Sequence, residues 1–177
     1  MVKLHVKISP ASVNDVVDIQ ELLRTTWLST YPNKEHGITK KHIQQLVKSI
    51  TSQEVIQKKQ MLVADMPSHV HLSVAKQGEG VVGICAGSKM ENRAHLKSLY
   101  IHPDMQGKGV GTLLWNEFKS WSAGSQEVYL HVATYNYKAI NFYQKMGFVD
   151  TGKRFIEDRY TFLDGKSIPQ VEMKYYF

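Results

Sequence analysis

The stretch Leu99-Tyr-Ile-His-Pro-Asp-Met-Gln-Gly-Lys-Gly-Val-Gly111 contains the strongest structural signal in the chain. An apolar run stops at His102-Pro103, and glycines then occupy positions 107, 109 and 111 before a segment with helical periodicity. This order is typical of a strand, a tight turn and the start of a helix. Glycine allows positive φ and close approach of a ligand to the backbone. Because the first N–H groups of a helix bind anionic oxygens and Lys108 adds a positive charge, the stretch predicts a phosphate site.

Two familiar phosphate-binding loops do not match this turn. A P-loop requires Gly-x-x-x-x-Gly-Lys-Ser/Thr, which does not occur in the sequence. A dinucleotide-binding fingerprint requires Gly-x-Gly-x-x-Gly, and the frame that starts at Gly107 ends on Thr112 instead of glycine. On these residues alone, a glycine-rich turn without a ligand remains an alternative.

Outside this stretch the chain alternates between strand and helix patterns, without a repeat or a linker. Its 177 residues suit one domain, which we expect to span 1–177. Ser12-Val-Asn-Asp15 fits a helix-capping pattern. The order predicts an α/β domain with a mixed, mostly antiparallel central sheet of about six or seven strands and helices on both faces. Strands are expected at 4–8, 71–76, 81–88, 94–101, 128–132, 160–163 and 168–177, and helices at about 16–23, 40–60 with a break near 51–52, 109–123 and 136–146.

Composition narrows the classes of partner. The formal charge of +6 favours an anionic partner, but the basic residues are scattered and the longest runs are pairs. The net charge is the only feature that supports nucleic-acid binding, and no basic stripe accompanies it, so no nucleic-acid partner is expected. No apolar run approaches the ~18 residues of a membrane helix, and Met1 to Pro10 lacks the apolar segment of a signal peptide. We therefore expect a cytoplasmic protein that does not associate with membranes.

No metal site is expected either. Cys85 is the single cysteine and lies in an apolar run, which is typical of a buried structural thiol. His69 and His71 alternate as on one face of a strand, but no further ligand lies at a suitable spacing. A pair of surface histidines is the simpler interpretation.

Two motifs resemble those of the GNAT superfamily of N-acetyltransferases. Gln106-Gly-Lys-Gly-Val-Gly111 is similar to its Gln/Arg-x-x-Gly-x-Gly/Ala signature. Asn136-x-x-Ala-x-x-Phe-Tyr-x-x-x-Gly-Phe148 resembles its Asn…Ala…Phe-Tyr-x-x-x-Gly-Phe helix, in the family's order and separation. The resemblance covers 99–148 well and the first third of the chain only in outline. It implies an N-acetyltransferase that uses acetyl-CoA as co-substrate, needs no metal and moves the acetyl group onto an amine. Dimers are common in the family, so the resemblance also allows a homodimer.

The resemblance assigns cofactor-binding roles to two segments. Backbone groups of the strand would hold the pantetheine arm like an added strand, and one N–H, that of Leu99 by position, would polarise the acetyl carbonyl. The amides of the glycine turn would hold the diphosphate of coenzyme A. Asn136 would contact the coenzyme, cap its own helix, or do both. The implied coenzyme-binding residues are Leu99, Tyr100, Ile101, Gln106, Gly107, Lys108, Gly109, Val110, Gly111, Asn136 and Tyr143.

Catalytic roles follow from the same resemblance. Tyr143 matches the family's tyrosine that protonates the departing thiolate, and a phenol with a pKa of ~10 is protonated at neutral pH. Periodicity alone would favour Tyr143 as a core residue, and its seven-residue spacing from Asn136 favours the family role. His131 lies where ribosomal-protein acetyltransferases of the family carry a glutamate base, and it could act directly or through water. A hydrogen-bonded sheet histidine is the alternative, and His95, Glu91 or ordered water are weaker candidates for the base.

The acceptor is expected to be a small amine. Trp27-Leu-Ser-Thr-Tyr31-Pro is similar to the same region of bacterial and archaeal polyamine acetyltransferases. Trp27 and Tyr31 could line a pocket for an alkylamine, because aromatic faces attract cations, or could pack the helix end on the sheet. Glu35, Glu157 and Asp158 are carboxylates that could hold a polyamine, but they are interpreted as ordinary surface residues. Polyamines therefore lead, acetylation of peptide or protein amino groups comes second, and a catalytically silent coenzyme A-binding module is the third hypothesis.

Overall fold

The computed structural model describes residues 5–177, which form a single α/β domain with one sheet. Its strands are β1 Lys7–Pro10, β2 Val70–Gln77, β3 Gly80–Met90, β4 Arg93–Ile101, β5 Glu127–Ala133, β6 Val149–Thr161 and β7 Ser167–Tyr176. Its helices are α1 Val16–Thr30, α2 Lys40–Ile50, α3 Gln53–Ala64, α4 Val110–Trp121 and α5 Tyr137–Lys145, with short 3-10 turns η1 Val13–Asp15 and η2 Pro103–Met105. The part of the expected first strand at Leu4 lies outside the described residues. None of these helices is long and apolar enough to cross a membrane.

The seven strands lie in the order β1-β2-β3-β4-β5-β7-β6. All neighbours are antiparallel except β4 and β5, which are parallel. Alternate residues of β2 and β3 point to opposite faces of the sheet and belong to two cores. Val74 and Ile84 pack against α1, with Leu22 among their partners. Ala75 and Cys85 pack on the opposite face with α4. The predicted mixed sheet with helices on both faces is confirmed, as is the burial of Cys85.

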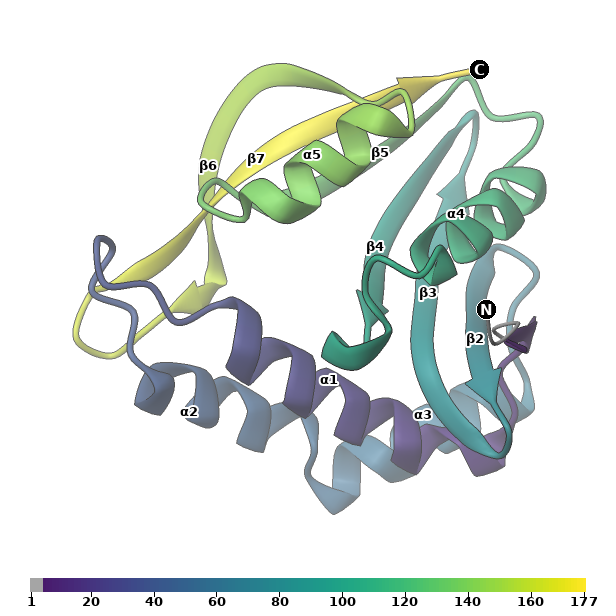
Figure 1. The fold of residues 1–177 in the computed structure, drawn as a ribbon, viewed down its shortest axis with the longest axis horizontal. Helices are drawn as coiled ribbons and strands as arrows, with labels where there is room; N and C mark the ends of the chain where they lie inside the picture. The colour runs from purple at the N-terminus through teal and green to yellow at the C-terminus, as the bar shows by residue number, and fades with distance from the viewer. Residues whose placement is uncertain (1–4) are drawn as a thin grey trace.

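The sheet opens between its two parallel strands. Only three residue pairs join β4 to β5, from Arg93 with Glu127 to His95 with Tyr129. Beyond His95 the strands diverge, as Figure 1 shows. The register between β3 and β4 also shifts near Ala86, which leaves Lys97 without a partner on β3. A bulge of this kind bends a strand and increases its twist, so it helps to turn β4 away from β5.

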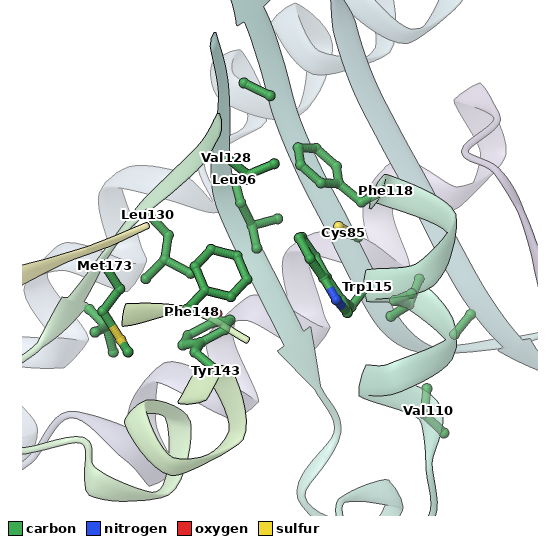
Figure 2. Close-up of a cluster of buried hydrophobic side chains, with 14 of the residues drawn as sticks. Cys85, Leu96, Val110, Trp115, Phe118, Val128, Leu130, Tyr143, Phe148 and Met173 are labelled. Atoms are coloured by element: carbon green, nitrogen blue, oxygen red, sulfur yellow. The ribbon is translucent and has the colours of Figure 1, made fainter. Parts of the chain in front are cut away.

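A core of large side chains joins the two halves of the sheet where they still pair. Figure 2 shows Trp115 and Phe118 from α4 beside Phe148 and Tyr143 from the other half. The ring centroids of Trp115 and Phe148 are 4.9 Å apart, and Phe118 is fully buried. Close packing of this kind holds one end of the opening rigidly while the other end stays apart.

Two expectations about single segments are wrong. β6 begins at Val149 rather than near residue 160. The sequence did not predict its first part because β6 is an edge strand, and its largely exposed, charged residues show no alternation of apolar and polar side chains. His71 is not a surface residue: it is 7% exposed and packs between Phe118 and Trp121, with its Nε2 atom 2.9 Å from Oε2 of Glu117. Within 5–177 no group of three His, Cys, Asp or Glu side chains is arranged so that it could hold a metal ion.

Candidate active site

A cavity of about 720 Å³ lies where β4 and β5 diverge, a volume typical of small-molecule sites. Residues of both strands, the glycine turn, α5 and the last turns of α1 line it. Among the expected site residues, its wall contains Leu99, Tyr100, Ile101, Gln106, Gly107, Gly109, Gly111, Asn136, Tyr143, His131 and Tyr31. Lys108, Val110 and Trp27 are not part of this wall.

The glycine turn forms an open cradle at the N-terminus of α4. Gly107 has φ of 75°, and Gly109, the N-cap of the helix, has φ of 85°. A Cβ atom at either position would meet no protein atom within 4 Å, so the space in front of these backbone groups is free. Val110 is buried at 1% exposure and anchors the first turn. A turn with exposed amides at a helix N-terminus fits a diphosphate group.

The edge of β4 offers two backbone amides to the cavity. His102 donates its N–H to the carbonyl of Val82 on β3, at 2.9 Å. Because successive residues of a strand direct their N–H groups to opposite edges, the N–H groups of Ile101 and Leu99 point away from β3, and that of Tyr100 points toward it. The carbonyl of Ile101 accordingly accepts a hydrogen bond from Gln106 Nε2, at 3.1 Å. Backbone contacts to a ligand are therefore available at Leu99 and Ile101, and Tyr100 contributes its side chain.

Tyr143 lies deep in the cavity wall, on α5. It is 9% exposed and packs edge-on against Phe142 and Phe148. Burial, with smaller contributions from Tyr100 and Cys85, raises its pKa above the ordinary value of a phenol. Its hydroxyl is therefore protonated at neutral pH and can act as a proton donor.

Two further polar residues of α5 face the opening. Asn136 accepts a hydrogen bond from the N–H of Ala139 at 3.2 Å, so it caps the helix and also lines the cavity. Lys138, which the sequence analysis did not single out, lines the cavity too and donates from Nζ to Gln106 Oε1 at 2.5 Å. This contact joins α5 to the loop after β4 across the opening. By contrast, Lys108 is exposed, and its Nζ lies 4.0 Å from the sulfur of Met105.

His131 occupies the other end of the cavity between two carboxylates. Its Nδ1 atom is 3.0 Å from Oε1 of Glu157, and its Nε2 atom is 3.7 Å from Oε2 of Glu172. Burial opposes ionisation of Glu157, but Arg159 and His131 outweigh it, so the pKa of that carboxyl is below its ordinary value. Glu157 is thus a partner of His131 rather than an ordinary surface residue, which only the fold could reveal.

The weaker base candidates differ in their surroundings. His95 stacks on Tyr129 with centroids 4.3 Å apart, and burial together with the charges of His131 and Lys97 lowers its pKa to about 4. It is therefore uncharged at neutral pH. Glu91 lies in the turn between β3 and β4, where it is exposed and has φ of 54°. It lines neither the main cavity nor the smaller one described next.

A second cavity of about 30 Å³ adjoins the main one at Tyr31, Tyr100, His131 and Lys97. The hydroxyls of Tyr31 and Tyr100 are 2.8 Å apart. Trp27 packs behind them, with its ring centroid 5.4 Å from that of Tyr31. The structure therefore places Tyr31 in the wall of both cavities and Trp27 in the layer that supports it.

A sheet that diverges around a cavity, with a glycine cradle at one end and a buried phenol within it, has the features of a protein that binds a phosphate-bearing molecule. The family comparison specifies this class. Residues 18–148 match the model of the Acetyltransferase (GNAT) family, and the chain belongs to this family.

Curated relatives with known names match part of the chain. The peptidyl-lysine N-acetyltransferase YjaB of Salmonella typhimurium is 32% identical over 81 residues, which cover 46% of this chain and 50% of that protein. The spermidine N(1)-acetyltransferase of Vibrio cholerae is 36% identical over 84 residues, which cover 44% and 47%. The chain spans about half the length of the curated relatives it matches.

A solved structure matches nearly the whole fold. The PaiA N-acetyltransferase of Thermoplasma acidophilum, solved with coenzyme A, has a TM-score of 0.76 at 22% identity and covers 98% of this chain and 99% of its own. At this level of identity the likeness establishes the fold.

Proposed function

We propose that residues 1–177 form one N-acetyltransferase domain that moves the acetyl group of acetyl-CoA onto a primary amine in a ternary complex. The observation that carries this proposal is one continuous cavity that runs from the glycine cradle along the open edge of β4 to Tyr143. The names of the curated relatives and the coenzyme A bound by the Thermoplasma protein support it.

The residues around the cavity suit each part of this transfer. When bound, acetyl-CoA supplies a thioester whose C–S bond breaks as the C–N bond to the acceptor forms. The N–H of Leu99 donates to the carbonyl oxygen, where negative charge develops. The amine gives up a proton to His131 or to water beside it, because only a neutral amine attacks. Tyr143 gives its phenolic proton to the departing sulfur and regains one from solvent, so protons balance.

Release of free thiol tests this function directly. We expect acetyl-CoA to yield free coenzyme A and one equivalent of N-acetylated product when a suitable amine is present. The panel of acceptors contains spermidine, aminoglycosides, amino acids and lysine peptides. Tight binding of coenzyme A without thiol release from any amine would instead support the catalytically silent module.

We expect Lys138→Met to weaken coenzyme A binding about tenfold, because it removes a positive charge that lines the cavity next to the cradle. Titration calorimetry at low and high salt measures the change, and the difference from the wild type should shrink as salt screens the charge. Lys145→Met, on the same helix but exposed and outside the cavity wall, is the matched control. Lys108→Met tests the competing hypothesis: if it weakens binding and Lys138→Met does not, the diphosphate contacts Lys108.

Two acceptor classes have support from relatives. The spermidine enzyme of Vibrio cholerae agrees with the polyamine resemblance around Trp27 and Tyr31, and YjaB supports peptidyl lysine. Both matches extend over less than half of this chain, so the acceptor class has to be argued from the cavity itself.

A further inference from the structure

The walls of the two cavities carry more positive than negative charge. The main cavity is lined by Lys97 and Lys138, and no Asp or Glu residue is part of its wall. The smaller cavity adds Arg159 and a single carboxylate, that of Glu157. A polyamine carries several positive charges. Carboxylates in the site would stabilise bound polyamine, whereas lysine and arginine side chains would destabilise it.

The nearby carboxylates are already engaged. Glu157 accepts a hydrogen bond from Arg159 Nε at 2.5 Å and contacts His131 at 3.0 Å. Glu172 lies 3.3 Å from Nζ of Lys153 and 3.7 Å from His131, and it lines neither cavity. Neither carboxylate is free to receive the second ammonium group of an acceptor.

Two cations at the smaller cavity still have donors to offer. Arg159 uses its Nε atom on Glu157 and lies over the ring of Tyr160 at 4.7 Å, and in the described part of the chain no hydrogen bond occupies its terminal nitrogens. Lys97, at the bulge of β4, forms no ion pair with any residue among 5–177. Guanidinium and ammonium groups with free donors bind carboxylates well.

The size of the smaller cavity matches one such group. Its volume of about 30 Å³ exceeds the roughly 10–15 Å³ that one water molecule requires, so it has room for a small group such as a carboxylate. The positive charges also act on His95. Burial and His131 lower its pKa most, and Lys97 and Arg159 lower it further. A negative group would therefore be stabilised at this position.

We infer that the acceptor is a small amine that carries a carboxylate close to its amino group, the chemistry of an α-amino acid. This inference rests on the proposed acetyl transfer. The carboxylate lies in the smaller cavity between Lys97 and Arg159, and the amino group faces His131 at the wall that the two cavities share. A polyamine is a poor acceptor in this arrangement.

Matched acceptors test the inference. We would measure kcat/KM for several α-amino acids, their α-amides, the decarboxylated amines, spermidine and a peptide with one lysine and blocked ends. We expect the best amino acid to exceed its amide at least about tenfold, the effect of one charge-assisted contact. The amide has the less basic amine, so a preference for the acid must come from the protein. An amide as good as its acid would overturn the inference, as would spermidine or the blocked peptide as the best acceptor.

Variants show whether Lys97 and Arg159 cause the preference. Lys97→Gln and Arg159→Gln should each bring the acid-to-amide ratio of kcat/KM close to one. Lys97→Gln is the cleaner variant because Lys97 does not contact Glu157. Arg154→Gln is the control, since Arg154 lies on the same strand as Arg159, pairs with Asp150 and lines neither cavity.

Different results would contradict the carboxylate site and the acetyl transfer itself. An unchanged acid-to-amide ratio in both Lys97→Gln and Arg159→Gln would contradict the carboxylate site and leave acetyl transfer intact. Absence of thiol release with every acceptor, while acetyl-CoA still binds, would contradict the proposed function, and the inference would fall with it.

Discussion

Gly109→Asp is expected to reduce the affinity for coenzyme A at least about 100-fold, which corresponds to roughly 2.7 kcal/mol. Gly109 has φ of 85°, in the left-handed region that other residues adopt at a cost of roughly 1–2 kcal/mol. The new side chain would enter the free space in front of the cradle and place a negative charge beside the diphosphate. Titration calorimetry with coenzyme A measures the loss.

Gly152→Asp provides the matched control for this substitution. Gly152 has φ of 80°, its Cβ position is equally free, and it lies on β6 outside both cavity walls. We expect a comparable loss of thermal stability in the two variants but unchanged affinity for coenzyme A in Gly152→Asp. If folded Gly109→Asp binds coenzyme A as tightly as the wild type, the glycine turn is not the diphosphate site.

Tyr143→Phe should lower kcat about 100-fold and change the dissociation constant of coenzyme A less than about twofold, because loss of a general acid affects the chemical step. Burial raises the pKa of Tyr143, so its phenol is fully protonated from pH 6 to 9 and the loss should be the same across this range. Steady-state and binding measurements on one preparation separate the two effects.

Phenylalanine keeps the packing of the ring, so this variant should remain folded. Tyr137→Phe is the control, since Tyr137 begins the same helix but is 69% exposed and outside the cavity wall. A kcat for Tyr143→Phe equal to that of the wild type at every pH would mean that Tyr143 serves only the core.

The strand, turn and helix around 99–121 could be predicted because their signals are local. Positive φ at Gly107 and Gly109 favours glycine, and Pro103 ends the strand next to them. β6 lacked such a signal, since its placement depends on pairing with β7 while its side chains remain largely in solvent. His71 was misplaced because its burial depends on α4, which packs on β2 from a distant part of the sequence.

The contacts that complete the candidate site were less accessible to sequence reasoning. Lys138 contacts Gln106, which is 32 residues away in the sequence, and His131 contacts Glu157, which is 26 residues away. The first pair depends on how far the two halves of the sheet diverge, and the second on the strand order β5-β7-β6, which brings β6 near β5. No periodicity encodes either arrangement. Trp27 and Tyr31 share one helix face by spacing, but the rotation of α1 decides that Tyr31 lines the cavities and Trp27 supports it. A lysine in the first turn of α5, two positions after Asn136, was the available signal for Lys138.

We expect the open edge of β4 and the glycine cradle to hold acetyl-CoA in the cavity between β4 and β5. A crystal structure with acetyl-CoA tests it most directly. We predict the diphosphate at the backbone amides of 107–111, the pantetheine arm along Leu99 and Ile101, and the thioester sulfur within hydrogen-bonding distance of the Tyr143 hydroxyl. A bound molecule located elsewhere, with the cradle empty or blocked, would contradict the account.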